Sequence, residues 1–90
     1  MAYEVNFTQR AAREFNDLPR QAQVRLTPRI EALADEPRPH GVKKLAAEED
    51  LYRIRVGDYR VIYTIRDDAL IVLVVDVGDR REIYRRGWGS

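Results

Sequence analysis

The sequence predicts an α+β fold with the element order β-α-α-β-β-β, in which an N-terminal helical hairpin packs on one face of a mainly antiparallel four-stranded sheet. Two observations support this fold class. Apolar residues recur with helical spacing between residues 8 and 35, and after residue 42 the spacing changes to that of strands. The dipeptide Gly57-Asp58 then joins two alternating segments, which is typical of a tight β-hairpin.

Residues 3–7 alternate apolar and polar side chains and therefore predict a short first strand. Thr8 suits the N-cap of a first helix, and Pro19 ends that helix because it lacks the amide that would continue the ladder. The inward residues of these two elements are expected to be Tyr3, Val5, Phe7, Ala11, Ala12, Phe15 and Leu18.

A second helix is expected over roughly residues 20–35, opened by Pro19. Pro28 inside this span removes a hydrogen bond and crowds the preceding turn, so we expect a kink there or a restart with Thr27 as N-cap. Prolines and a glycine make residues 36–42 a loop. The inward residues of the second helix are expected to be Val24, Leu26, Ile30, Leu33 and Ala34.

Residues 51–56 and 59–66 are expected to form the hairpin around Gly57-Asp58. Residues 70–77 are nearly all apolar, as in a strand covered on both faces. After a turn at Gly78-Asp79, residues 82–86 form a short terminal element whose type the pattern leaves open. The hairpin residues expected to face the core are Tyr52, Ile54, Val56, Tyr59, Val61 and Tyr63.

Length and composition limit the class of protein. We expect residues 1–90 to form one domain. No apolar run reaches the about 18 residues of a membrane helix, and a signal-peptide pattern is missing, so a cytoplasmic protein without membrane contact is expected. Cysteine is absent and His40 is the single histidine, which excludes thiolate zinc and multi-histidine sites. We therefore expect no metal.

The kind of basic residue is informative. Sixteen basic and fifteen acidic residues give a net charge of +1, but fourteen of the sixteen are arginine. The planar fork of donors in arginine suits phosphate binding and stacking on bases. A high-GC genome would enrich arginine equally well. Residues 51–66 and 80–86 each carry a net charge of +3, and these clusters favour an anion-binding role.

The predicted hairpin brings three arginines onto one face. A two-residue turn places Arg55 directly opposite Arg60, with Arg53 two positions away on the same side. Like charges facing each other destabilise a sheet by up to about 1 kcal/mol. This face is therefore predicted to bind a polyanion, most simply a phosphodiester backbone. The alternative is that the arginines extend into solvent or pair with Glu82 or Asp76.

Three residues outside the hairpin are weaker candidates. Tyr84 lies among four arginines and is either a phenol beside bound anions or an ordinary half-buried tyrosine. Trp88 is suited to stack on a base or on the sheet. His40 is expected to be solvated in its proline-rich loop, with a role as general base as the alternative.

Residues 51–63 (LYRIRVGDYRVIY) and 76–84 (DVGDRREIY) resemble the RelE/ParE superfamily of type II toxins, and most of all its RelE branch. The resemblance covers nearly the whole chain. It implies a ribosome-dependent endoribonuclease that cuts mRNA in the ribosomal A site without a metal or a small-molecule cofactor. It also implies three partners, namely the ribosome, mRNA and a cognate RelB-like antitoxin that holds the toxin inactive.

Carried over position by position, the functional residues of the family fall on arginines and one tyrosine. Arg60 and Arg80 are implied to stabilise the charge that develops on the phosphate. Tyr84 is implied to stack on a base or to transfer a proton. The implied RNA-binding residues are Arg53, Arg55 and Arg81.

The chain departs from the family pattern at three places. RelE proteins commonly have lysines where this chain has Arg53 and Arg55, and arginine is a poor general base, so the identity of the proton-transfer residue stays open. Asp79 stands where a lysine is often found. The C-terminal helix is expected to be short or absent. The alternatives are a ParE-like inhibitor of DNA gyrase without enzymatic activity, and an RNA-binding module without catalysis.

Overall fold

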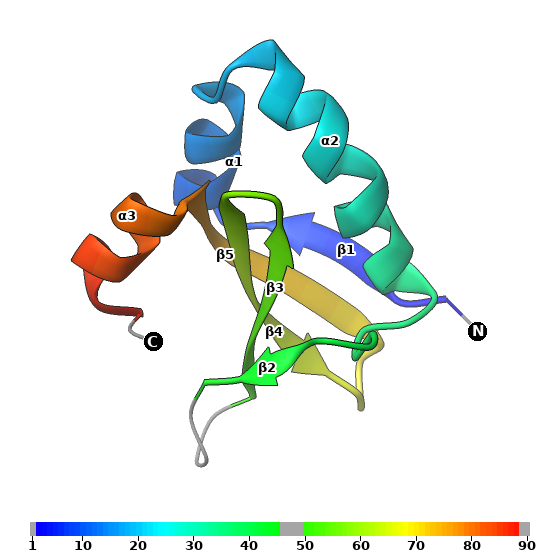
Figure 1. Ribbon diagram of the computed structural model, residues 1–90. Helices are drawn as coiled ribbons and strands as arrows, with labels where there is room; N and C mark the ends of the chain where they lie inside the picture. Colours follow the sequence, from blue (N-terminus) through cyan, green and yellow to red (C-terminus); the bar gives the residue numbers. More distant parts are fainter. Residues whose placement is uncertain (1, 46–49, 89–90) are drawn as a thin grey trace.

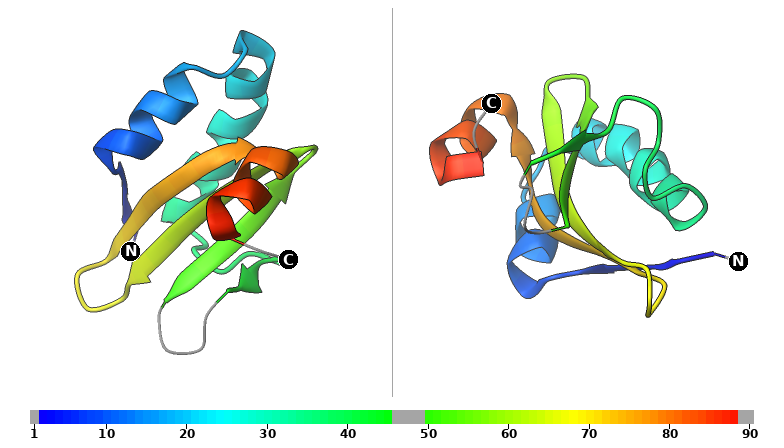
Figure 2. Two further views of the ribbon diagram at one scale, coloured as in Figure 1. Left: turned by 90° about the vertical axis from the view of Figure 1, so that its left-hand side faces the viewer. Right: turned by 90° about the horizontal axis from the view of Figure 1, so that it is seen from below.

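The computed structural model describes residues 2–45 and 50–88, which form one mixed sheet with helices on both of its faces (Figures 1 and 2). The strand order is β1-β5-β4-β3-β2, with β1 parallel to β5 and the other neighbours antiparallel. In chain order the elements are β1 (Glu4–Phe7), α1 (Gln9–Asn16), α2 (Arg20–Glu31), η1 (Ala32–Ala34), β2 (Lys43–Lys44), β3 (Leu51–Val56), β4 (Tyr59–Arg66), β5 (Ile71–Asp79), α3 (Arg80–Ile83) and η2 (Tyr84–Trp88).

Within the described residues the sheet has five strands rather than the four expected. The additional strand is β2, which pairs with the outer edge of β3 opposite Tyr52 and Arg53. Its two lysines are both exposed, so it has no alternation of apolar and polar side chains that a periodicity argument could detect. The α+β class and the mainly antiparallel pairing are confirmed.

The first helix begins as predicted. The Thr8 side chain accepts a hydrogen bond from the amide of Ala11 at 3.0 Å, which satisfies one of the free amides of the first turn of α1. Phe15 of α1 packs edge-to-face on Phe7 of β1, with ring centroids 5.9 Å apart. Pro19 separates α1 from α2 and stands at the N-cap position of α2.

One of the two alternatives at Pro28, the restart at Thr27, is wrong, and so is the inward position of Val24. The helix α2 does not restart at Thr27 but continues through Pro28, and the Thr27 hydroxyl donates to the carbonyl of Gln23 at 2.7 Å. Val24 does not face the core and is 60% exposed. The reason is geometric, because Val24 lies about 200° around the helix from the buried Ala22. The buried residues of α2 and η1 are Ala22, Leu26, Ile30 and Leu33.

The hairpin register is confirmed. Val56 pairs with Tyr59 and Arg55 with Arg60 around the Gly57-Asp58 turn. Gly57 has a φ of +61° while Asp58 has no positive φ, which is the pattern of a type II′ turn with glycine at its first central position. The hairpin side chains that pack in the core under α1 and α2 are Tyr52, Ile54, Val56, Tyr59, Val61 and Tyr63.

A β-bulge in β5 changes the face that its later side chains take. Consecutive residues of β4 pair with Asp76 and Val74, which leaves Val75 without a partner. Strict alternation from the buried Val74 would place Asp76 in the core under the helices. The bulge places Val77 there instead and turns Asp76 to the face that carries the hairpin arginines.

The C-terminal helix is short rather than absent. It lies on the side of the sheet opposite α2 (Figure 2). Its Ile83 is 2% exposed and Ile62 of β4 is 0% exposed, although neither belongs to the core under α1 and α2. The arginine face is therefore partly covered. Among the described residues, no helix has the length and apolar character needed to cross a membrane.

The positive φ of Gly57 predicts that Gly57→Ala destabilises the protein. A residue with a Cβ at positive φ costs about 1–2 kcal/mol, and the added Cβ would also displace the guanidinium of Arg25. We expect the free energy of unfolding, measured by urea denaturation, to fall by about this amount. Gly57→Asn is the matched control and should lose less, because asparagine tolerates this conformation. Equal stability of Gly57→Ala and the parent chain would contradict the turn assignment.

Candidate functional site

One cavity on the arginine face brings together all six residues predicted to act on RNA. Its volume is about 320 Å³. The hairpin strands form one wall and the helix α3 forms the other, so segments distant in sequence meet here. The lining residues are Arg53, Arg55, Arg60, Arg80, Arg81, Ile83 and Tyr84.

Backbone and capping contacts fix the position of α3 relative to the hairpin. The amide of Arg80 donates to the carbonyl of Asp58 in the hairpin turn at 2.8 Å. The Asp79 side chain accepts from the amide of Glu82 at 2.8 Å and is the N-cap of α3. Asp79, which departs from the family pattern, therefore caps the helix that brings Arg80 and Tyr84 to the cavity.

The cavity arginines make no ion pair with the carboxylates of the described residues. Both carboxylates proposed as partners, Glu82 and Asp76, pair instead with Arg86. Three of the cavity arginines, Arg55, Arg80 and Arg81, are exposed, as the solvent alternative expects, whereas Arg53 and Arg60 are buried. Arg53 is 9% exposed, and its buried Nε has no hydrogen-bond partner. Arg60 is 8% exposed, so two largely buried positive charges lie in the sheet without an ion pair to any carboxylate of the described residues.

Arg60 is held in place by its own turn. Its Nη1 donates to the carbonyls of Gly57 and Tyr59 at 3.2 and 3.1 Å. These bonds use one nitrogen of the guanidinium, and the other two make no hydrogen bond within the described part of the chain. Arg60 is thus a fixed cation with free donors, which is the arrangement that a binding site for a charged oxygen requires.

The electrostatics of the cavity favour an anion. Burial, with the charge of Arg55 as a further cause, lowers the pKa of Arg53. Burial also lowers the pKa of Arg60, and the neighbouring charges of Arg55, Arg53 and Arg80 lower it further. Arginine remains charged at neutral pH, so the lowered pKa values mean that keeping Arg53 and Arg60 charged costs free energy. A bound anion would offset that cost.

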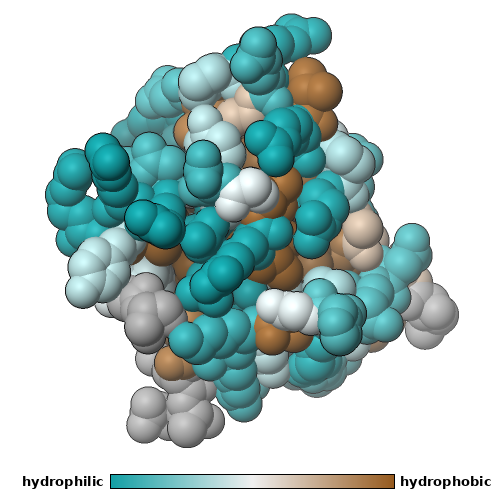
Figure 3. All heavy atoms as spheres, in the orientation of Figure 1, coloured by the Kyte–Doolittle hydropathy of each residue, from teal (hydrophilic) through white to brown (hydrophobic). Residues whose placement is uncertain are grey.

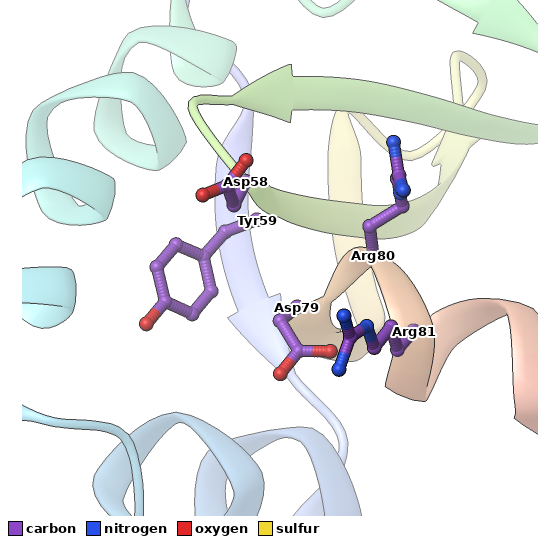
Figure 4. A pocket seen from close by; sticks show the side chains of 5 residues that line it. All are labelled: Asp58, Tyr59, Asp79, Arg80 and Arg81. Atoms are coloured by element: carbon purple, nitrogen blue, oxygen red, sulfur yellow. The ribbon is translucent and has the colours of Figure 1, made fainter.

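A second hollow of about 400 Å³ lies between the hairpin turn and the start of α3 and shares Arg80 and Arg81 with the arginine cavity (Figure 4). The guanidinium of Arg80 points away from Asp79, whereas that of Arg81 lies on the side of Asp79. Two carboxylates line this hollow, so it suits a polyanion less well than the arginine cavity. Its lining residues are Asp58, Tyr59, Asp79, Arg80 and Arg81.

The opposite face of the sheet carries a hollow of a different character. Seen in the orientation of Figure 1, the surface of the molecule is largely hydrophilic, with apolar surface in the centre of the view (Figure 3). A hollow of about 320 Å³ between α1 and α2 is lined by Phe7, Phe15 and Ile30, and no cation lines it.

The sequence did not reveal the contacts that hold the C-terminal segment. Asp76 is 1% exposed, and its two oxygens accept from Arg86 Nη1 at 2.6 Å and from Trp88 Nε1 at 2.5 Å. Arg86 also pairs with Glu14 and Glu82, each at 3.3 Å. We call this arrangement the Asp76 clasp. The indole N–H of Trp88 is thus bound to a residue of the sheet. The one feature of the sequence that could have indicated the clasp is Asp76, a single carboxylate in an otherwise apolar strand.

Comparisons with known proteins agree with this architecture. A family model described as the ParE toxin of type II toxin–antitoxin systems matches residues 5–84. The mRNA interferase toxin RelE of Escherichia coli K12 is 31% identical over 88 residues, covering 93% of this chain and 92% of that protein. A chain of the archaeal RelE–RelB complex from Pyrococcus horikoshii OT3 is 30% identical with a TM-score of 0.77, covering 89% of this chain and 97% of that chain. A chain of the RelBE2 toxin–antitoxin complex from Mycobacterium tuberculosis is 29% identical with a TM-score of 0.78, and the match covers 89% of this chain and 93% of that chain.

The chain belongs to the RelE/ParE superfamily of type II toxins. Its similarity to RelE proteins, in sequence and in structure, places it in the RelE branch.

The Asp76 clasp generates a prediction that Trp88 can report, because Trp88 is the only tryptophan of the chain. Asp76→Asn removes a buried charge that holds both Arg86 and Trp88. We expect the free energy of unfolding to fall by about 2–3 kcal/mol. The fluorescence of Trp88 should shift to longer wavelength in the folded state, because the indole becomes more solvated.

Glu82→Gln is the control for this prediction, because it removes only partly exposed ion pairs, with Arg85 and Arg86, and should cost less than about 1 kcal/mol. Unchanged fluorescence and stability in Asp76→Asn would show that the clasp does not hold the C-terminal segment.

Proposed function

We propose that this chain is the toxin of a type II toxin–antitoxin system and acts as a ribosome-dependent endoribonuclease on mRNA. One observation supports this function above all others. Five arginines line one cavity without ion pairs to carboxylates of the described residues, and such guanidiniums are suited to bind phosphate. The relatives in complex with RelB support a cognate antitoxin as the partner that restrains the activity.

The chemistry proposed is attack of a ribose 2′-hydroxyl on the adjacent phosphodiester. The new bond joins the 2′-oxygen to phosphorus, the bond to the 5′-oxygen breaks, and the proton of the 2′-hydroxyl is removed while the leaving oxygen takes one up. The products are a 2′,3′-cyclic phosphate and a 5′-hydroxyl. Negative charge increases on the non-bridging oxygens in the transition state, and fixed guanidiniums are suited to stabilise it.

The positions of the arginines support a division of roles. Arg60, buried and fixed by two carbonyls, and Arg80, anchored through its amide to the hairpin turn, are assigned to the transition-state charge. Tyr84 is 68% exposed at the cavity and is therefore free to stack on a base or transfer a proton. The residues assigned to gripping the RNA backbone are Arg53, Arg55 and Arg81.

The function itself is tested by mapping mRNA 5′ ends after brief expression and by assaying DNA gyrase with the purified protein. We expect new ends within translated codons, carrying 5′-hydroxyl groups, and unimpaired supercoiling by gyrase. A chain that inhibits gyrase and leaves mRNA intact would be a ParE-like inhibitor. RNA binding without cleavage on the ribosome would make it a non-catalytic RNA-binding module.

The division of roles predicts different kinetics for two alanine variants. Arg80→Ala should slow single-turnover cleavage on saturated ribosomes by about a hundredfold or more, as for the loss of an oxyanion-hole donor. Arg53→Ala should mainly weaken association and its dependence on salt. Arg53→Lys restores the usual family residue and should retain activity. Wild-type cleavage by Arg80→Ala, together with loss of cleavage in Arg53→Ala, would reverse the assigned roles.

A further inference from the structure

A separate hollow of about 330 Å³ adjoins the arginine cavity at the outer edge of β3. The two share Arg53 and Arg55, so an extended ligand in the cavity can continue into the hollow. Neither the resemblance nor the assigned roles uses the residues that complete it. We call it the edge hollow, and it is lined by Arg29, His40, Gly41, Arg53, Ile54 and Arg55.

The edge of β3 is open at this hollow. The strand β2 pairs only with Tyr52 and Arg53, and Gly41, with a φ of +88°, turns the preceding chain out of the ladder. The carbonyl of Leu51 accepts from Leu45 on the β2 side. Backbone groups of an antiparallel strand alternate between its two edges, so the amide of Arg55 also faces the β2 side, beyond the end of β2. An anion in the hollow can accept from this strand-edge amide.

The charges around the edge hollow are all of one sign. Arg29 lies in the last turn of α2 and is exposed, and it makes no ion pair with the described residues. Arg53, nine-tenths buried, has an Nε without a hydrogen-bond partner. His40 is exposed at the rim and adds one ring donor when neutral and two when charged. Among the described residues that line the hollow, none is acidic.

We propose that the edge hollow is a second phosphate subsite, in which Arg29, His40 and the Arg55 amide bind the sugar–phosphate backbone next to the nucleotide in the arginine cavity. The proposal rests on the proposed function, in that RNA occupies the cavity. Arg53 reaches both sites and links consecutive phosphates. Such contacts set the path of the strand and are independent of base sequence.

The test is direct binding of a fluorescein-labelled 2′-O-methyl oligouridylate, which cannot be cut by 2′-hydroxyl attack, measured by fluorescence anisotropy over a series of salt concentrations. Arg29→Ala/His40→Ala should weaken binding by about tenfold, because charge-assisted bonds to phosphate are lost. The slope of log K against log salt should fall by about one for each lost phosphate contact. Arg20→Ala, in the first turn of the same helix, is the matched control and should leave both quantities unchanged.

Each outcome decides the proposal. Affinity and salt slope equal to those of Arg20→Ala would overturn it. So would a double variant that binds RNA normally but loses binding of labelled polyglutamate, since the hollow would then receive an acidic protein segment. If the double variant loses RNA affinity while the parent chain fails to cleave mRNA on ribosomes, the subsite stands and the proposed function fails.

Discussion

The two-residue turn at Gly57-Asp58 is the constraint on which the rest of the site depends. A shift of one residue in the hairpin would exchange its two faces and place Arg55 and Arg60 in the core. The turn is fixed in three ways. Gly57 adopts the positive φ, Arg60 bonds to the carbonyls of Gly57 and Tyr59, and the carbonyl of Asp58 holds the start of α3. The same few atoms thus set the register and connect the hairpin to the helix that completes the cavity.

The bulge in β5 and the Asp76 clasp explain why that helix lies on the arginine face. Without the bulge, a buried carboxylate would stand in the apolar core, where an unpaired charge is very costly. With it, Asp76 attracts Arg86 and Trp88 and draws the C-terminal segment over Ile62. The arginines of this segment fall into two pairs. Arg85 and Arg86 form ion pairs with carboxylates, whereas Arg80 and Arg81 form none with the described residues and line the cavity.

Features with a strong local signal could be predicted from the sequence. The hairpin register, its two faces and the Thr8 cap follow from side-chain alternation and turn chemistry, and all three were confirmed. The strand β2 could not be predicted, since two exposed lysines at an edge have no apolar pattern. The exposure of Val24 does not follow from its apolar character, because its angle around the helix places it opposite the buried face. The clasp was missed because the bulge that turns Asp76 has no sequence signature of its own.

We propose that the arginines of the cavity bind the scissile phosphodiester. The most direct test is the structure of the toxin on a ribosome programmed with mRNA that carries a 2′-deoxy nucleotide at the cleavage position, which prevents the reaction. We expect the scissile phosphate between the guanidiniums of Arg60 and Arg80, with the adjoining backbone bound to Arg53 and with Tyr84 beside the phosphate. A scissile phosphate bound elsewhere, with none in the arginine cavity, would contradict the proposal.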